Sequence, residues 1–369
     1  MTKISTDNTY IKTITELLNK IDTETIQLSK QYFVESIDYV NNIILNRKDV
    51  IALTGGVSFD IVKSNHKNHA DFMSNIFQIK DSQILHDTFI WAYNTYHNKG
   101  FSFQYFYHEL MAWKSFYITI NSLQFESIIK LYDYLISLHE YFIQHSVSSH
   151  TYIPNINDTQ IYEEFLNALL NTDLTKALQI SHSFIEDKDD IVSFWEEIIL
   201  PSLYTIGDKW ANAEISVGTE HSATSICQRV MSEHYGSIIK YIKDKKNILV
   251  TTSPNELHEV GARMLSDILE LNGYNVTYLG SKVPIEDLLD IVSTNNIDIV
   301  LISTTLVSNI DKTQEMVKQI RNRYKIKIIL GGQAYKLNPS AFKFINADYC
   351  MNSTHELLEL LDGQLNANT

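Results

Sequence analysis

Residues 247–261 read NILVTTSPNELHEVG, and this stretch decides the fold. The apolar run at 248–251 predicts a short buried strand, and a helical pattern begins directly behind Gly261. Between them lies a loop that contains Glu256 and His258. A polar loop at the carboxyl end of a first parallel strand is where open α/β sheets bind their ligands.

The loop residues are suited to holding a metal-containing ligand. Glu256 lies two residues before His258, so its carboxylate can hold one ring nitrogen and leave the other free to ligate a metal. Gly261 lets a bulky group approach the backbone. Taken alone, the pattern is also compatible with a solvated loop histidine.

The rest of the C-terminal region alternates strands and helices. Together with 247–253, continuous apolar runs predict strands at 275–280, 298–304, 326–330 and 348–352, with helices at 259–272, 284–295, 309–324, 338–345 and 353–362. This order predicts a flavodoxin-like, doubly wound parallel sheet across 247–369. Ser303 and Thr305 lie at the end of the third strand, and Gly331 and Gly332 end the fourth. A Gly-x-Gly-x-x-Gly motif is absent, which argues against a dinucleotide.

This set of motifs resembles the cobalamin-binding domain. The resemblance covers Asn247 to about Gly363 and implies that His258 binds cobalt from below. It also implies that Ser303, Thr305, Gly331 and Gly332 surround the buried nucleotide tail of the cofactor. Without the resemblance, Gly331-Gly332 is an ordinary turn after a strand.

Residues 158–246 predict a four-helix bundle that holds a second group of candidate residues. Trp210 is followed, after nine residues, by Glu220 and His221 at the start of the fourth helix. A Trp that closes the bundle core and a solvated Glu-His turn would account for the same residues.

Together with the C-terminal motifs, this spacing resembles the CarH-type light-sensing cobalamin proteins, whose bundle caps the upper face of the corrin. The resemblance implies adenosylcobalamin as cofactor, with Trp210 packed over the adenosyl group and Glu220 hydrogen-bonded to it. His221 would take the upper cobalt position after light removes the adenosyl group. CarH proteins begin with a DNA-binding domain, whereas residues 1–150 lack its basic recognition helix.

Residues 1–150 predict an all-helical domain rich in aromatic residues and histidine, with breaks at 54–56 and 98–100. Aromatic residues at helical spacing are typical of a core, or of a dimerisation bundle, but they also suit a pocket for a conjugated ligand. The region is similar to helical domains of the photocobilin group, which implies a bilin such as biliverdin. The candidate contacts are His69, Tyr105, His108 and Trp113. Both cysteines, at 227 and 350, lie outside this domain, so the bilin would be held non-covalently.

Composition limits the remaining functions. The 369 residues carry a net charge of −14, which argues against a nucleic-acid surface. The sequence also lacks an apolar run long enough to cross a membrane, a signal peptide and a disulfide framework, so we expect a cytoplasmic protein. It shows neither a nucleophile–base pair nor a Cys/His zinc spacing, so we expect no catalytic set of its own.

The sequence therefore predicts a cobalamin-binding light sensor that acts as a homo-oligomer on an unidentified downstream signalling partner. The alternative is a corrinoid methyl-carrier protein of a methyltransferase system, which shares the bundle and the sheet. A module that stores or delivers cobalamin is a third possibility that the sequence leaves open.

Overall fold

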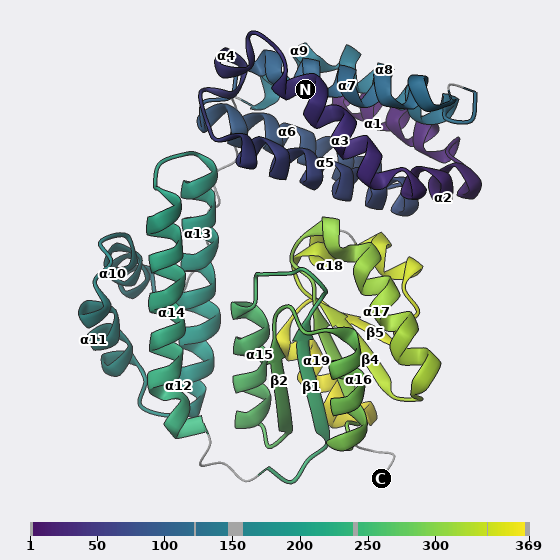
Figure 1. Ribbon diagram of the computed structural model, residues 1–369. Helices are drawn as coiled ribbons and strands as arrows, with labels where there is room; N and C mark the ends of the chain where they lie inside the picture. The colour runs from purple at the N-terminus through teal and green to yellow at the C-terminus, as the bar shows by residue number, and fades with distance from the viewer. Residues whose placement is uncertain (1–2, 122, 147–157, 239–242, 338, 366–369) are drawn as a thin grey trace. The chain divides into compact units, whose positions relative to one another are not determined.

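The computed structural model describes residues 3–121, 123–146, 158–238, 243–337 and 339–365. The chain forms two compact units (Figure 1). The N-terminal unit comprises residues 1–150 with 211–213, and the C-terminal unit comprises 151–210 with 214–369. The predicted boundary at 150 lies outside the described residues, whereas those at 158 and 246 directly precede the first bundle helix, at Thr159, and the first strand, at Asn247.

The N-terminal unit is helical throughout its described residues, as predicted. Its helices are α1 (Lys3–Asn19), α2 (Thr23–Gln31), α3 (Phe33–Leu45), α4 (Val50–Thr54), α5 (Phe59–Ile79), α6 (Ser82–Asn98), α7 (Phe103–Asn121), α8 (Glu126–Ser137) and α9 (His139–Ser146). Helices α4 and α6 end at the two predicted breaks. These breaks touch each other, since a Cβ atom on Gly55 (φ +64°) would lie 2.3 Å from the carbonyl oxygen of Gly100. Across the described part of the chain, every helix is too short or too polar to cross a membrane.

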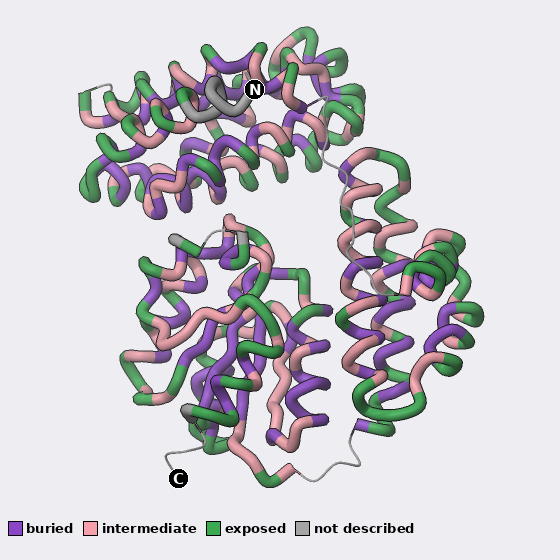
Figure 2. The backbone as a smooth tube through the Cα atoms, turned by 180° about the vertical axis from the view of Figure 1, so that it is seen from behind, coloured by how far each residue is buried: buried purple, intermediate pink, exposed green. Residues whose placement is uncertain are grey.

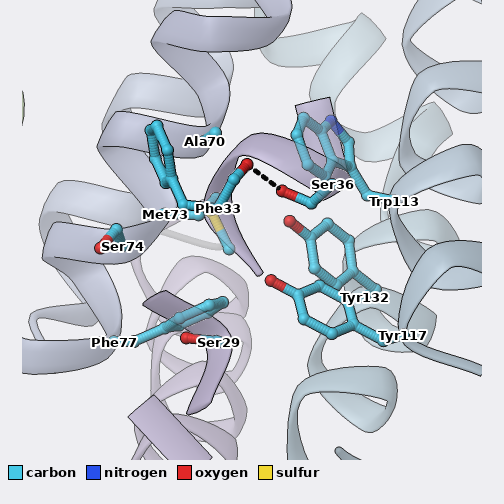
Figure 3. Close-up of a pocket in the computed structure, with 10 residues that line it drawn as sticks. All are labelled: Ser29, Phe33, Ser36, Ala70, Met73, Ser74, Phe77, Trp113, Tyr117 and Tyr132. Atoms are coloured by element: carbon cyan, nitrogen blue, oxygen red, sulfur yellow. Dashed lines mark hydrogen bonds between the residues drawn. The ribbon is translucent and has the colours of Figure 1, made fainter. Parts of the chain in front are cut away.

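Aromatic side chains form much of the core of the N-terminal unit. Tyr93, Tyr105 and Trp113 are each only 1% exposed, and Tyr132 is equally buried. Figure 2 shows buried, purple stretches recurring along the helices of this unit between intermediate and exposed ones. Figure 3 shows Trp113 and Tyr132 among the side chains that line a small pocket in this unit. The prediction that aromatic residues at helical spacing fill a core is confirmed for these four residues.

The C-terminal unit begins with the helical bundle. Its helices are α10 (Thr159–Leu170), α11 (Leu174–Phe184), α12 (Lys188–Ser193), α13 (Leu200–Ala211) and α14 (Val217–Ile238), and a π-helical segment, Phe194–Ile199, joins α12 to α13. Helix α12 begins at Lys188 because Asp187 caps the backbone N–H groups of residues 189 and 190. Pro201 follows the π-helical segment, which accommodates its missing N–H donor.

The second part of the C-terminal unit is a parallel sheet with the order β2-β1-β3-β4-β5, which is the predicted flavodoxin-like order. The strands are β1 (Asn247–Thr252), β2 (Asn275–Gly280), β3 (Ile299–Ser303), β4 (Lys327–Gly331) and β5 (Tyr349–Met351). Helices α15 (Val260–Leu271), α16 (Ile285–Thr294), α17 (Ile310–Arg323), α18 (Gln333–Leu337) and α19 (Thr354–Leu360) connect or follow them. Residues Val307–Asn309 and Pro339–Phe344 form 3-10 turns, and Leu361–Leu365 form a π-helical turn. One face of the sheet carries an apolar core cluster. On the opposite face lie Leu249, Val300 and Leu330, which are buried as well, so both faces of the sheet are covered.

The bundle packs against α15 of the sheet. Val260, Met264 and Leu271 belong to the same apolar cluster as the core of the bundle. Within this contact the indole N–H of Trp195 donates to the buried Asp267 carboxylate at 3.3 Å. The bundle and the sheet therefore share one core.

Candidate functional site

The carboxyl ends of β1, β3 and β4 meet at one edge of the sheet. Thr252 pairs with Ser303, and Ser303 pairs with Gly331. The backbone N–H of Ser253, the residue after Thr252, donates to the Ser303 carbonyl oxygen at 2.9 Å. The predicted site residues at 256–261, 303–305 and 331–332 are thus brought to one edge of the sheet, although up to 76 positions separate them in the sequence (332 minus 256).

Glu256 is the most constrained side chain at this edge. Its side chain is fully buried, and Oε1 lies 2.5 Å from Nδ1 of His258. Oε2 accepts hydrogen bonds from the backbone N–H groups of Thr305 (3.1 Å) and Leu306 (2.8 Å) and from Nδ2 of Asn309 (3.1 Å). One carboxylate therefore fixes the histidine ring and ties the loop after β1 to the segment after β3.

These contacts also set the charges of the pair. Burial alone would raise the pKa of Glu256, but hydrogen bonds from His258 and Leu306 outweigh it and lower this pKa to about 2. The hydrogen bond to Glu256 raises the pKa of His258 against the effect of burial, and the charge of Glu220 adds to the increase. Glu256 is therefore an anion that orients His258 and increases its basicity.

The other side of the His258 ring is open. The His258 side chain is 57% exposed, so Nε2 faces away from the buried Glu256. Leu257 and Leu306, beside this histidine and its carboxylate, are 60% and 44% exposed. Exposed apolar side chains beside a potential metal-binding histidine are expected where a large bound molecule covers them.

A further polar group at this edge lacks a partner. Ser253 directly follows β1 and is fully buried, and its Oγ has no hydrogen-bond partner among the described residues. A buried hydroxyl without a hydrogen-bond partner lowers stability unless a bound ligand or a water molecule supplies that partner. The edge therefore offers an exposed imidazole nitrogen, apolar cover and an unsatisfied hydroxyl, a donor set that fits a corrinoid with a polar tail.

The predicted glycines differ in their surroundings. Gly332 has φ +106°, and a Cβ atom there would lie 2.4 Å from the carbonyl oxygen of Thr304. Gly332 is thus required by the fold itself. Gly261, at the start of α15, is exposed, and a Cβ atom there would meet nothing within 4 Å.

The predicted upper-face residues lie on two helices of the bundle. Trp210 is half-buried near the end of α13, and Glu220 and His221 are in the first turn of α14. Glu220 holds Nδ1 of His221 through Oε2 and accepts from the Thr224 hydroxyl (3.1 Å) through Oε1. The His221 side chain is 75% exposed.

The four residues predicted to hold a second chromophore are divided among different contacts. His69 stacks on Trp113 with ring centroids 5.0 Å apart, and Tyr105 stacks on His66 at 6.1 Å. His108 lies 3.2 Å from the guanidinium group of Arg47. Of the four, the structure brings His69 and Trp113 into direct ring contact.

Comparison with known protein families matches both parts of the C-terminal unit. Residues 246–361 match a family model described as the B12 binding domain, and residues 161–233 match a second model with the same description. The C-terminal unit is a cobalamin-binding module. The first match covers the sheet with the Glu256–His258 pair, and the second covers most of the bundle.

Three curated proteins and one solved structure are similar to parts of this chain. Methionine synthases from Mycobacterium leprae and Mycobacterium tuberculosis are each 28% identical over 130 residues, which is 33% of this chain and 11% of theirs, so the match spans about a tenth of their length. A corrinoid protein from Desulfitobacterium hafniense is 19% identical over 187 residues, 47% of this chain and 83% of its own. The solved structure of the Methanosarcina barkeri monomethylamine corrinoid protein is 15% identical over 55% of this chain and 96% of its own, with a TM-score of 0.48.

Proposed function

We propose that the cobalamin-binding module holds its cofactor with Nε2 of His258 as the lower cobalt ligand. The observation that carries this proposal is the buried Glu256, which fixes Nδ1 of His258 and leaves Nε2 exposed. Ser303, Thr305, Gly331 and Gly332 would border the nucleotide tail of the cofactor. Gly261 would leave room for the cofactor to approach the backbone. When bound, cobalamin supplies a cobalt centre that carries an alkyl group on its upper face.

The test of the lower ligand is His258→Ala. The variant should retain hydroxocobalamin more weakly than wild type and give an absorption spectrum without histidine ligation. His355→Ala is the matched control, because that histidine is 82% exposed on α19 and follows β5, which β3 and β4 separate from β1. If His258→Ala binds cobalamin with the wild-type spectrum, the assignment is wrong.

We further propose that the chain is a corrinoid carrier that presents an alkyl group to a partner enzyme. The corrinoid protein from Desulfitobacterium hafniense supports this reading, since the similarity spans 83% of that protein's length. In this function the chain's own residues bind and orient the cofactor, and the partner supplies the catalytic groups. Purified protein should then prefer methylcobalamin, and His221→Ala should change its affinity little.

A light-responsive sensor is the second candidate, and the pairing of Glu220 with the exposed His221 favours it. In this function the module binds adenosylcobalamin in the dark, with Trp210 and Glu220 against the adenosyl group. After illumination, wild type should form a stable adduct through His221 that His221→Ala cannot form. Equal light products in the two proteins would exclude this role of His221. A downstream partner and a homo-oligomeric state belong to the same proposal.

The second chromophore of that sensor also remains a proposal. A bilin would have to be held non-covalently, since Cys227 and Cys350 lie in the C-terminal unit. Co-expression with a bilin-producing enzyme should give red absorbance, and Trp113→Leu should reduce it. A colourless protein that forms a tight dimer would favour a dimerisation role for the N-terminal unit.

A further inference from the structure

Two hydrogen bonds join the helical bundle to opposite ends of the strand-end edge. On α14, Nε2 of Gln228 donates to Oε1 of Glu259 at 3.5 Å, and Glu259 directly follows His258 in the loop after β1. On α13, the hydroxyl group of Tyr204 donates to Oε1 of Gln333 at 3.4 Å, and Gln333 is the first residue of α18, after β4. The side of α13 that carries Tyr204 therefore faces the edge at which His258 lies.

Gly207 lies on this side of α13, between two large side chains. It is three residues from both Tyr204 and Trp210. Since an α-helix turns by about 100° per residue, Gly207 lies about 60° from each of them around the helix axis. Gly207 is exposed, and a Cβ atom there would meet nothing within 4 Å. Tyr204 and Trp210 thus border a position without a side chain, which we call the Gly207 gap.

The fold itself does not require glycine at this position. Gly332 has a left-handed φ and packs on Thr304, whereas Gly207 has neither a left-handed φ nor a close neighbour among the described residues. Glycine in a helix interior also destabilises the helix relative to alanine. A glycine of this kind is expected where a bound molecule approaches the helix closely.

We propose that the Gly207 gap admits the group that cobalt carries on the side opposite His258, so that Gly207 determines how large this group can be. The inference rests on the proposed function, in which the sheet edge supplies the lower cobalt ligand. The bundle is joined to that edge at both of its ends, so it is the part of the unit that covers the upper side of the cofactor. Flat aromatic groups pack well against Tyr and Trp rings, so the gap suits an adenosyl group as well as a methyl group.

The experiment compares three cobalamins that differ in the upper group. Full-length protein is titrated in the dark with hydroxocobalamin, methylcobalamin and adenosylcobalamin, and wild type should bind all three. Gly207→Leu fills the gap, so it should bind hydroxocobalamin within about twofold of wild type but adenosylcobalamin at least about tenfold more weakly. Gly207→Ala should give a smaller loss. An equal loss for all three cobalamins, or no loss, overturns the proposal.

Gly236→Leu is the matched control. Gly236 is also an exposed glycine inside a bundle helix, and a Cβ atom there would meet nothing within 4 Å. It follows Glu220 on α14 by 16 residues (236 minus 220), or about 24 Å along the helix. This variant should bind all three cobalamins like wild type. Without cofactor, Gly207→Ala should unfold at the wild-type temperature or about 2–4 °C above it, which checks that the variant is folded.

The outcomes separate this inference from the proposed function. If His258→Ala loses histidine ligation while Gly207→Leu binds adenosylcobalamin like wild type, the inference is overturned and the lower ligand stands. If Gly207→Leu selectively loses adenosylcobalamin while His258→Ala keeps the wild-type spectrum, the gap lies at the upper group and the lower ligand is wrong. Wild type that binds hydroxocobalamin but not adenosylcobalamin also overturns the inference, because the gap then does not admit the large group.

Discussion

Glu109 and His69 are in contact inside the N-terminal unit, and burial shifts their pKa values in opposite directions. Burial raises the pKa of Glu109 from 4.5 to about 7, and burial lowers that of His69 from 6.5 to about 3. The folded protein thus keeps the proton of Glu109 to higher pH than the unfolded chain does. The stabilisation from Glu109 is present below pH 4.5 and is lost as pH rises through about 7. The stabilisation from His69 is present above pH 6.5 and is lost as the pH falls toward 3.

Glu109→Gln should therefore change the pH dependence of stability. The variant cannot ionise, so its stability relative to wild type should rise between pH 4.5 and pH 7.5, by up to about 3 kcal/mol. Amide hydrogen exchange in α7, compared between the two proteins at each pH, measures the difference. His69 is present in both proteins, so its contribution cancels. A difference that does not vary with pH would mean that Glu109 is already ionised in the fold below neutral pH.

At the Glu256 site, the sequence predicted part of the hydrogen-bond network. The pairing of Glu256 with His258 follows from their spacing of two residues. Leu306 and Asn309 were missed, because they reach Glu256 only once β1 and β3 are neighbours in the sheet. Their position just after the Ser303 strand end, which the sequence did place at the same edge, was the signal that could have found them. Ser253 was missed for another reason, since an unsatisfied hydroxyl leaves no pattern in a sequence.

At the scale of elements, Gly332 and Gly261 provide matched tests of fold and site. Gly332→Ala forces a Cβ atom toward the Thr304 carbonyl oxygen in a left-handed conformation. It should lower the stability of the cofactor-free C-terminal unit by about 2 kcal/mol or more. Gly261→Ala meets open space and removes a helix-breaking residue, so it should leave stability unchanged or raise it by up to about 1 kcal/mol. Thermal unfolding without cofactor measures both effects.

Cobalamin titration completes this comparison. If the cofactor lies against the start of α15, Gly261→Ala should weaken its binding although the protein is no less stable. Unchanged affinity in Gly261→Ala would place the cofactor away from that turn, whereas weak binding in Gly332→Ala alone would reflect only its damaged fold.

The strands could be predicted because buried parallel strands are continuous apolar runs, and each predicted strand overlaps the observed one. The short helix predicted at 338–345 coincides with the 3-10 turn Pro339–Phe344, but α18, which begins at Gln333, was missed. The reason is local geometry: Gly332 packs on Thr304, and the N–H of Ala334 donates to the Thr304 carbonyl oxygen at 3.1 Å. The helical turn therefore starts directly behind the strand. A sequence pattern does not show this contact, because it joins segments about 30 residues apart.

At the scale of the whole molecule, the proposed cobalamin ligands and the shared core of bundle and sheet all belong to the C-terminal unit. The cobalamin site should therefore be separable from residues 1–150 by dividing the chain in the segment 147–157.

A fragment of residues 158–369 should fold and bind hydroxocobalamin with an affinity within about tenfold of the full-length protein. The physical reason is that the bundle packs on α15 through Val260 and Met264 and through the Trp195–Asp267 hydrogen bond, none of which involves the N-terminal unit. Absorption titration measures the affinity, and circular dichroism checks that the fragment is folded. The same fragment carrying His258→Ala should lose the histidine-ligated spectrum. A folded fragment that binds cobalamin far more weakly than the full-length protein would show that residues 1–150 contribute to the cobalamin site.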